Sequence, residues 1–284
     1  MSRVLLRPGL LRPGLLSPGL LRPGLLSPVL RAEWTKLRTV SGPAWLLAAA
    51  AAATVAISLA AEVATSCPAR VTCPVDPVKL SLTGVQLGQA VVAILAVLVI
   101  GNEYSTGLIR LTLAAMPRRT QVLGAKAAIV MILVLITAAV AVAGSVLAGH
   151  LILPGHGFTA ARGFLVPSLS GGPSLRAATG AVLYLGLIAL LALGIAAILR
   201  DNAAAIGVVL GVLYLTPIIA AFVSNPVWHK RIERYAPVNA GQAIFSTSGV
   251  KHLPISPWAG LGVLAIWAAI ALLAGGLVLR LRDA

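Results

Sequence analysis

The sequence predicts an all-α polytopic membrane protein with six transmembrane helices and with both termini in the cytoplasm. The chain of 284 residues is 59% hydrophobic and only 10% charged, whereas soluble domains carry about 25% charged residues. Six apolar segments are each close to the length of about 20 residues that a helix needs to cross a bilayer. Lys and Arg gather between these segments on alternate sides, which sets the orientation of the chain.

The chain is predicted to divide into a tail at 1–28, an interfacial helix at 29–42 and a six-span domain at 43–284. Proline recurs at every fifth position of the tail from Pro8 to Pro28, and this spacing forbids a continuous helix. We interpret the tail as a flexible or extended cytoplasmic segment. Its leucine pairs and arginines touch anionic lipid in one interpretation, and have no role in the other.

The segment 29–42 is predicted to form an amphipathic helix at the inner surface of the membrane. Ser27-Pro28 is a favourable start for a helix. Leu30, Trp34 and Leu37 follow at helical spacing on one face, and basic residues lie around the other side. The helix contacts membrane lipid in either of two interpretations, as a simple anchor or as an anchor that also touches a partner.

The six predicted spans follow in order, and they carry no charged residue near their centres. Their bounds are Pro43–Ala61, Thr83–Gly101, Ala127–Gly149, Ala177–Leu199, Ala203–Val223 and Trp258–Leu279. Charges within spans mark ion or proton pathways, so their absence argues against a proton- or sodium-coupled transporter. Polar features within the spans leave alternatives open. Gln86 and Gln89 either line a translocation path or bond to a neighbouring helix. Gly207 and Gly211 serve either a dimer contact or internal packing.

The insert at 101–119, between the second and third spans, is the most informative part of the chain. It is polar and carries Arg110, Arg118 and Arg119. We predict a short helix that ends before Pro117, although alternation at 109–113 also suits a strand. Apolar residues lie on two sides of this helix, and a helix of that kind outside the membrane requires another protein to cover it.

The distribution of Lys and Arg places this insert in the cytoplasm. Fourteen of the 22 basic residues lie in the N-terminal tail, the insert, the turn after the fourth span and the C-terminus, and eight lie in the other three loops. The positive-inside rule then makes both termini cytoplasmic. The net charge of +15 does not indicate nucleic-acid binding, because a basic face of that kind would be concentrated in one soluble module.

Two features are predicted in the outer loops. Cys67 and Cys73 lie in one short loop, where they either form a disulfide in an oxidising compartment or remain free thiols. Trp228, Ile232 and Tyr235 have helical spacing and predict a short amphipathic helix before the last span. Thr216-Pro217 is expected to kink the fifth span.

Sequence motifs for catalysis are absent. The chain has no P-loop, no His-Glu-x-x-His and no Gly-x-Ser-x-Gly motif. Neither the cysteines nor the four histidines have metal-ligand spacing. We therefore expect no cofactor, no metal and no enzymatic activity in this chain.

Several segments resemble the type-2 permease subunits of bacterial ATP-binding cassette (ABC) transporters in their actinobacterial form. These segments are AEWTKLRT at 32–39, GNEYSTGLIRLTLAAMPRR at 101–119, APVNAGQAI at 236–244, and the run from SPWAGLGVLAIWAAIAL to the terminal RLRDA. The likeness extends from about Arg31 to Ala284, and the tail lies outside it.

The resemblance implies a permease subunit of an ATP-driven exporter in a bacterial cell membrane. It implies a homodimer or heterodimer of permeases that binds cytoplasmic ATPase subunits, with ATP and Mg²⁺ in those partners. The ATPase-coupling surface would comprise Glu103, Tyr104, Thr106, Gly107, Arg110, Arg118 and Arg119. The alternative function is a membrane anchor or regulatory protein that holds a cytoplasmic partner without transporting anything.

Overall fold

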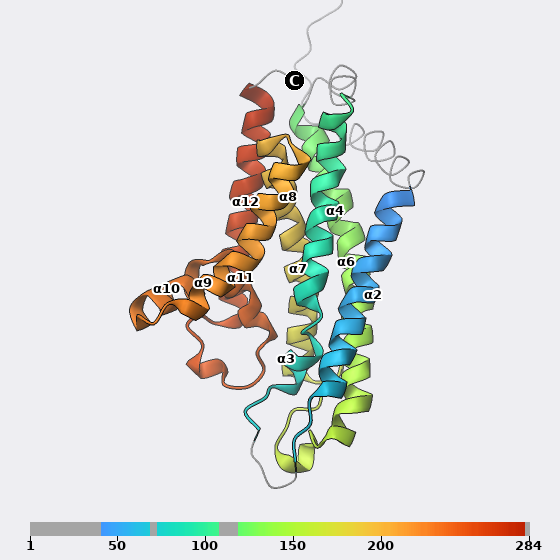
Figure 1. Cartoon of the computed structure of the whole chain (residues 1–284), viewed down its shortest axis with the longest axis vertical. Helices are drawn as coiled ribbons and strands as arrows, with labels where there is room; N and C mark the ends of the chain where they lie inside the picture. The colour runs from blue at the N-terminus through green and yellow to red at the C-terminus, as the bar shows by residue number, and fades with distance from the viewer. Residues whose placement is uncertain (1–40, 69–72, 108–118, 282–284) are drawn as a thin grey trace, which may run out of the picture.

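The computed structural model describes residues 41–68, 73–107 and 119–281, and its described residues form helices and loops without any strand. Six helices are long and apolar enough to cross a membrane, and they lie roughly along one another in an elongated bundle (Figure 1). The predicted fold class is confirmed: the protein is an all-α multi-pass membrane protein.

The six spans occupy the predicted places, but several helices extend beyond the apolar segments. The helices are α2 (Ser41–Ala64), α4 (Val85–Ser105), α6 (Arg119–Ile152), α7 (Gly172–Leu199), the fifth span described below, and α12 (Pro257–Leu281). The largest difference is in α6, which begins at Arg119 rather than at the predicted Ala127. Hydropathy identifies the apolar segment that can lie in lipid. The helix itself continues beyond that segment for as long as its backbone N–H and C=O groups form helical hydrogen bonds.

The fifth span is not one regular helix. It consists of α8 (Asn202–Leu210), a π-helical turn (Gly211–Leu215) and α9 (Thr216–Phe222). Pro217 has no N–H to donate to the preceding turn, and the hydroxyl of Thr216 donates to the Val212 carbonyl over 2.9 Å. A π-helical turn that ends at Leu215 therefore interrupts the fifth span, two residues before Pro217, where the sequence predicts a kink.

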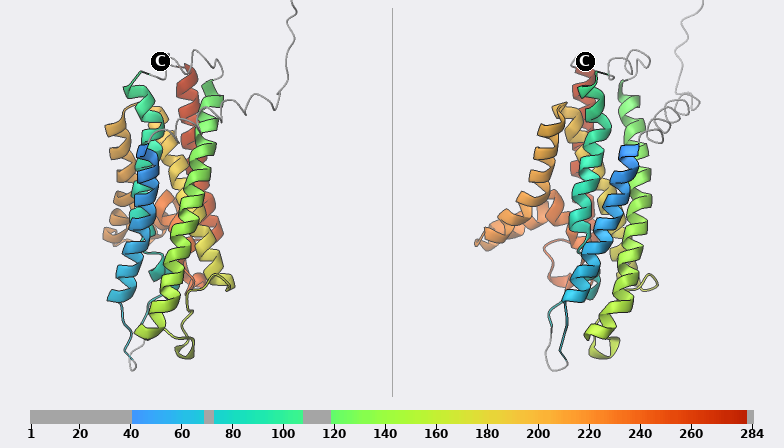
Figure 2. Two further views of the ribbon diagram at one scale, coloured as in Figure 1. Left: turned by 90° about the vertical axis from the view of Figure 1, so that its right-hand side faces the viewer. Right: turned by 45° about the vertical axis from the view of Figure 1, so that its right-hand side comes forward.

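Short helices connect some of the spans. They are α3 (Pro77–Ser81), α10 (Pro226–Tyr235) and α11 (Pro237–Gln242), with 3-10 turns at Leu153–His156, Ala160–Arg162, Ala243–Phe245 and Val250–His252. Helix α3 lies toward the end of the bundle away from the C-terminus, and α10 and α11 lie nearer the middle of its height (Figure 1). The predicted amphipathic helix in the last loop is α10, and it projects sideways from the bundle (Figures 1 and 2). Prolines begin all three short helices, where a missing N–H costs nothing.

Helix α7 lies at the centre of the bundle. It packs against α4, α6, α8 and α12, while α2 covers the outer side of α4 and α6. Tyr184, Ile188 and Leu193 of α7 are fully buried. The largest hydrophobic cluster therefore forms around α7. Every other span except α2 packs against this helix.

Glycines bring α7 and α12 into close contact. A methyl group on Gly194 would lie 2.5 Å from the backbone carbonyl carbon of Ala271, and one on Gly275 would lie 2.8 Å from the Cβ of Ala197. Each helix thus places a glycine against an alanine of the other. Small residues at such positions let two backbones approach, and here no larger side chain fits.

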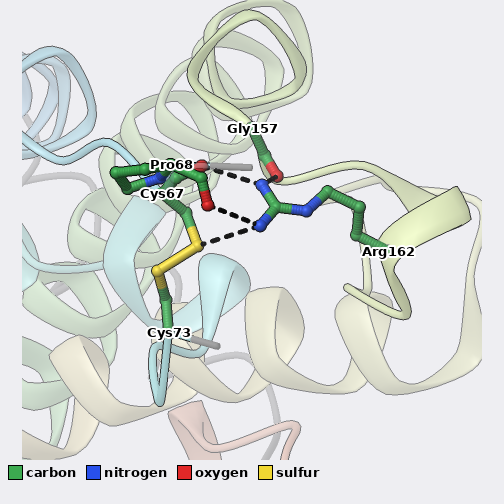
Figure 3. The surroundings of a disulfide bond; sticks show 5 residues. All are labelled: Cys67, Pro68, Cys73, Gly157 and Arg162. Carbon is green, nitrogen blue, oxygen red and sulfur yellow. Dashed lines mark hydrogen bonds between the residues drawn. A yellow bond between two sulfur atoms is a disulfide. The ribbon is translucent and has the colours of Figure 1, made fainter. Parts of the chain in front are cut away.

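A disulfide between Cys67 and Cys73 closes the loop after α2. The guanidinium of Arg162 donates to the carbonyl oxygens of Cys67 over 2.8 Å, of Pro68 over 2.8 Å and of Gly157 over 2.9 Å (Figure 3). Arg162 comes from the loop that follows α6. One side chain therefore joins the first and second loops at this end of the bundle.

Asp76 joins the first loop to the last one. Its carboxylate caps α3 through the N–H groups of Val78 and Lys79, and also accepts from the backbone N–H of Thr247 over 2.6 Å and of Ser248 over 2.8 Å. Burial raises the pKa of Asp76, but the hydrogen bonds from Thr247, Ser248 and Lys79 outweigh it and hold the pKa below its usual value. The ionised form is therefore the one that this structure stabilises.

Several predicted features lie outside the described residues. They are the tail at 1–28, nearly all of the interfacial helix at 29–42 with Leu30, Trp34 and Leu37, and the predicted helix within the insert. These features remain predictions.

Candidate functional site

Helices α4 and α6 hold the two ends of the insert. Helix α4 ends at Ser105, and Gly107 follows with a positive φ of 70°, a conformation that suits glycine. The hydroxyl of Thr106 donates to the Asn102 carbonyl over 2.6 Å. Thr106 and Gly107 are exposed. The end of α4 is thus well defined, and it lies at the same end of the bundle as the end of α12 (Figure 1).

Glu103 lies inside the bundle rather than on an open surface. Its carboxylate accepts a hydrogen bond of 2.7 Å from the ammonium of Lys126 on α6, and only 2% of the Lys126 side chain is exposed. The early start of α6 explains this contact, because it places Lys126 two turns inside the helix. The prediction put Glu103 on the coupling surface and Lys126 in the connecting segment. Both residues instead form a buried ion pair beneath the insert.

Two further contacts connect the base of the insert to the turn between α7 and α8. The guanidinium of Arg200 lies over the Tyr104 ring, 5.5 Å from its centre, and donates to the Val278 carbonyl of α12 over 2.9 Å. The side-chain amide of Asn202 donates to that of Asn102 over 3.1 Å. The base of the insert therefore contacts α6, the turn between α7 and α8, and α8, and Arg200 in that turn also bonds to α12. We call Glu103, Lys126, Tyr104, Arg200 and the pair Asn102–Asn202 the basal cluster.

The other predicted coupling residues are only partly placed. Tyr104 is half-buried in the basal cluster. Arg110 and Arg118 lie outside the described residues, and Arg119 begins α6. Sequence reasoning missed Lys126, Arg200, Asn102 and Asn202. The sequence marks these residues only as polar positions at the ends of apolar spans.

A second polar group lies within the bundle, nearer the opposite end. The hydroxyl of Tyr184 donates to the Gln89 side chain over 2.5 Å, and both side chains are fully buried. Gln89 and Gln242 donate to the side-chain oxygen of Gln86, each over 3.2 Å. The hydroxyl of Tyr214, in the π-helical turn, donates to the Gln86 backbone carbonyl over 2.6 Å. These five residues form the glutamine–tyrosine cluster.

Both glutamines bond to neighbouring segments, Gln89 to Tyr184 of α7 and Gln86 to Gln242 of α11, and a translocation path along them stays a prediction. Gln89 is enclosed and bonds to a neighbouring helix, so it serves helix packing. Gln86, Tyr214 and Gln242 are half-buried and form the accessible edge of the cluster. Its groups are amides and phenols, which exchange hydrogen bonds without carrying charge.

Glu62 is a buried acid near the end of α2. It is 0% exposed, and its carboxyl oxygens make no direct hydrogen bond to the residues that the structure describes. The neighbouring Ser81 hydroxyl donates instead to the Pro77 carbonyl over 3.1 Å. A Cβ on Gly149 would meet Ser81 and lie 2.8 Å from Glu62, so Gly149 leaves the space that both side chains occupy.

Within the described ranges, no three His, Cys, Asp or Glu side chains gather as metal ligands do. His150 contacts the Pro167 carbonyl over 2.9 Å. No protein-family model matches the chain, and no curated protein matches it.

Proposed function

We propose that this protein is the membrane-spanning subunit of an ATP-driven exporter of the ABC class in a bacterial cell membrane. It forms part of the substrate pathway and binds separate cytoplasmic ATPase subunits through the insert at 101–119. The observation that carries the proposal is the insert itself, a basic segment between two spans whose base is fixed by a buried ion pair. Its resemblance to permease subunits agrees with that role.

Energy for transport has to come from a partner in this proposal, because the sequence has no P-loop. A partner shifts the conformation of the bundle only if it binds two conformations with different affinity. The basal cluster supplies a physical route for that shift. A force on the insert reaches α6 through Lys126, and reaches α7, α8 and α12 through Arg200 and Asn202.

The substrate pathway is assigned to the accessible edge of the glutamine–tyrosine cluster and to a second permease copy. Gln86, Tyr214 and Gln242 offer neutral hydrogen-bonding groups in an otherwise apolar bundle. Gly207 and Gly211 lie where an added methyl would meet nothing within 4 Å, so internal packing within the described residues does not use them. We assign this face of the fifth span to the dimer contact, in a homodimer or a heterodimer.

Co-purification from native membranes tests the proposal. Tagged full-length protein is expected to bring down a Walker-type ATPase, and the double variant Arg110→Glu/Arg118→Glu is expected to lose it while remaining in the membrane. Lys251→Glu, in the last loop at the other end of the bundle, is the matched control and should keep the ATPase. Absence of any ATPase with the unaltered protein would overturn the proposal.

The orientation has its own test, because the chain contains two cysteines only. A membrane-impermeant maleimide added to reduced, intact cells should label Cys73, the more exposed of the two. Thr106→Cys in a background with both cysteines replaced by serine should be labelled only after the cells are opened. The reverse pattern would contradict cytoplasmic termini.

Reconstitution separates transport from anchoring. A transporter with its ATPase in vesicles should hydrolyse ATP faster when a transported substrate is added. An anchor or regulatory protein would bind the ATPase without any such response, and that result would favour the second function.

A further inference from the structure

A cavity of about 770 Å³ lies between α10 and the spans α7, α9 and α12. Its walls are apolar, with Leu191 and Ile195 from α7, Ile219 from α9, and Trp267 and Ile270 from α12. Its size falls within the range of about 300–1,000 Å³ that ligand sites occupy. The lining residues of α12 extend from Trp267 to Ala274, so the cavity runs for roughly 10 Å along this helix.

Helix α10 closes one end of this cavity and gives it a polar rim. Trp228, Ile232 and Tyr235 face the cavity, and so does Arg231, the one charged residue among the described lining residues. The indole N–H of Trp267 donates to the Tyr235 carbonyl over 3.1 Å, which holds α10 against α12. Tryptophan and tyrosine with an apolar body and a polar edge are typical of the membrane–water boundary.

The charge of α10 is strongly positive. Lys230 and Arg234 flank Arg231 in sequence, and all three side chains are exposed. Glu233 is the one acidic residue on this helix, and its carboxylate lies 3.3 Å from the imidazole of His229. The guanidinium of Arg231 lies over the Trp228 ring, 5.2 Å from its centre, at the mouth of an apolar cavity.

We propose that this cavity holds one acyl chain of an anionic phospholipid, with the lipid phosphate at Arg231. The apolar walls suit a hydrocarbon chain, and the basic rim at the same end suits a phosphate, for which arginine has a matching geometry. Arginine and lysine near a membrane surface attract anionic headgroups in the same way. The site therefore selects a lipid by its headgroup, unlike the general layer of lipid around a span. The proposal is independent of whether the protein is an exporter.

Fluorescence quenching by brominated lipid gives a direct test, because Trp228 and Trp267 line the cavity. The full-length protein with Trp34, Trp45 and Trp258 replaced by phenylalanine is reconstituted in phosphatidylcholine. Brominated phosphatidylglycerol or brominated phosphatidylcholine is then added at small, equal fractions. Phosphatidylglycerol is expected to quench at lower fractions than phosphatidylcholine.

Two pairs of variants test the headgroup and chain contacts separately. Arg231→Gln should weaken the apparent affinity for phosphatidylglycerol about fivefold, since one basic residue contributes roughly 1 kcal/mol to anionic-lipid binding. Lys251→Gln removes the same charge at a position away from the cavity and should leave the apparent affinity for phosphatidylglycerol unaltered. Ala274→Phe should reduce quenching by filling the cavity, whereas Ala139→Phe on the exposed side of α6 should not.

Other outcomes would overturn the proposal. Equal quenching by the two lipids in the unaltered background, or no effect of Arg231→Gln, would leave only non-selective lipid at this face. Failure of both lipids to quench would mean that a second protein copy or another ligand covers the cavity. Should the tryptophan replacements unfold the protein, native mass spectrometry of the natural sequence answers the same question. Retention of phosphatidylglycerol over phosphatidylcholine supports the site, and loss of both alike overturns it.

Discussion

The ammonium of Lys126 lies 2.7 Å from the carboxylate of Glu103, and the two side chains are almost fully buried. The pair joins α4 to α6 directly beneath the insert. A buried pair of this kind adds little stability compared with apolar residues, but removal of one partner leaves a charge in a medium that solvates it poorly. The pair therefore contributes mainly by fixing the position of α4 relative to α6 at the base of the insert.

Removal of either partner of this pair should destabilise the protein far more than removal of both. Glu103→Gln and Lys126→Met are each expected to cost about 3–5 kcal/mol, because each removes the oppositely charged neighbour of a buried charge. The double variant should recover much of that loss. Thermal unfolding of the four proteins in one detergent measures the coupling, and strictly additive losses would contradict a direct ion pair.

Asp76 should stabilise the loop contacts at neutral pH and lose this effect in acid. Because the folded pKa lies below the ordinary value, the contribution is complete above the unfolded pKa of about 3.9 and disappears as the pH falls through the lower folded pKa. Asp76→Asn should therefore reduce stability at pH 7, and the difference should shrink below about pH 3.9. Unfolding curves of both proteins across this range are the measurement, and a difference that grows in acid would contradict the assignment.

Arg162 should matter more to the loop structure than the disulfide beside it. Arg162→Met removes three hydrogen bonds from a charged donor to carbonyl oxygens, each worth roughly 1.5–3 kcal/mol, and a fourth to the Cys67 sulfur. The Cys67–Cys73 bond closes a loop with a sequence separation of six residues, for which the chain-entropy relation gives about 2 kcal/mol. We expect a larger drop in Tm for Arg162→Met than for Cys67→Ser/Cys73→Ser. The opposite order would show that the covalent bond determines the loop.

The hydroxyl of Tyr184 should be needed for packing rather than for the accessible edge of the glutamine–tyrosine cluster. Tyr184→Phe removes the short bond to the buried Gln89 side chain and should cost about 1–3 kcal/mol, since a buried acceptor loses its donor. Tyr214→Phe affects a half-buried group and should cost less. Parallel unfolding measurements compare the two, and equal losses would argue against this division of the cluster.

Glu62→Gln should leave the protein as stable as before or make it more stable. The carboxyl group is fully buried without a direct hydrogen bond to the described residues, and an ionised form there is costly. Glutamine keeps the shape and removes the ionisable group. Glu233→Gln on α10, where the side chain is about a third exposed, is the control. A clear loss of stability in Glu62→Gln alone would point to a required carboxylate.

The spans could be predicted from the sequence because lipid imposes a strong, local constraint on length and apolarity. Helix α10 could also be predicted, since Trp228, Ile232 and Tyr235 repeat at helical spacing and Pro226 begins the helix. The start of α6 was missed because Arg119, Gln121 and Lys126 interrupt the apolar pattern. Helical backbone hydrogen bonds continue through such residues regardless of their polarity.

The contacts of the candidate site could not be predicted in the same way. Lys126 lies 23 residues from Glu103, and Tyr184 lies 95 residues from Gln89. Hydropathy identifies each helix but not its rotation about its own axis, and rotation decides which polar side chain meets which partner. Glu103 therefore looked like a surface residue beside a loop, although its side chain points into the bundle.

The close contact of α7 and α12 has a mechanical consequence. Gly194 against Ala271 and Gly275 against Ala197 leave no side chains between the backbones that could rearrange to absorb a sliding motion. We expect α7 and α12 to move together as one rigid body during any conformational change. Opening and closing would then occur at the borders of this pair, where α4, α6 and the fifth span pack against α7, and the π-helical turn at Gly211–Leu215 offers the fifth span a place to bend.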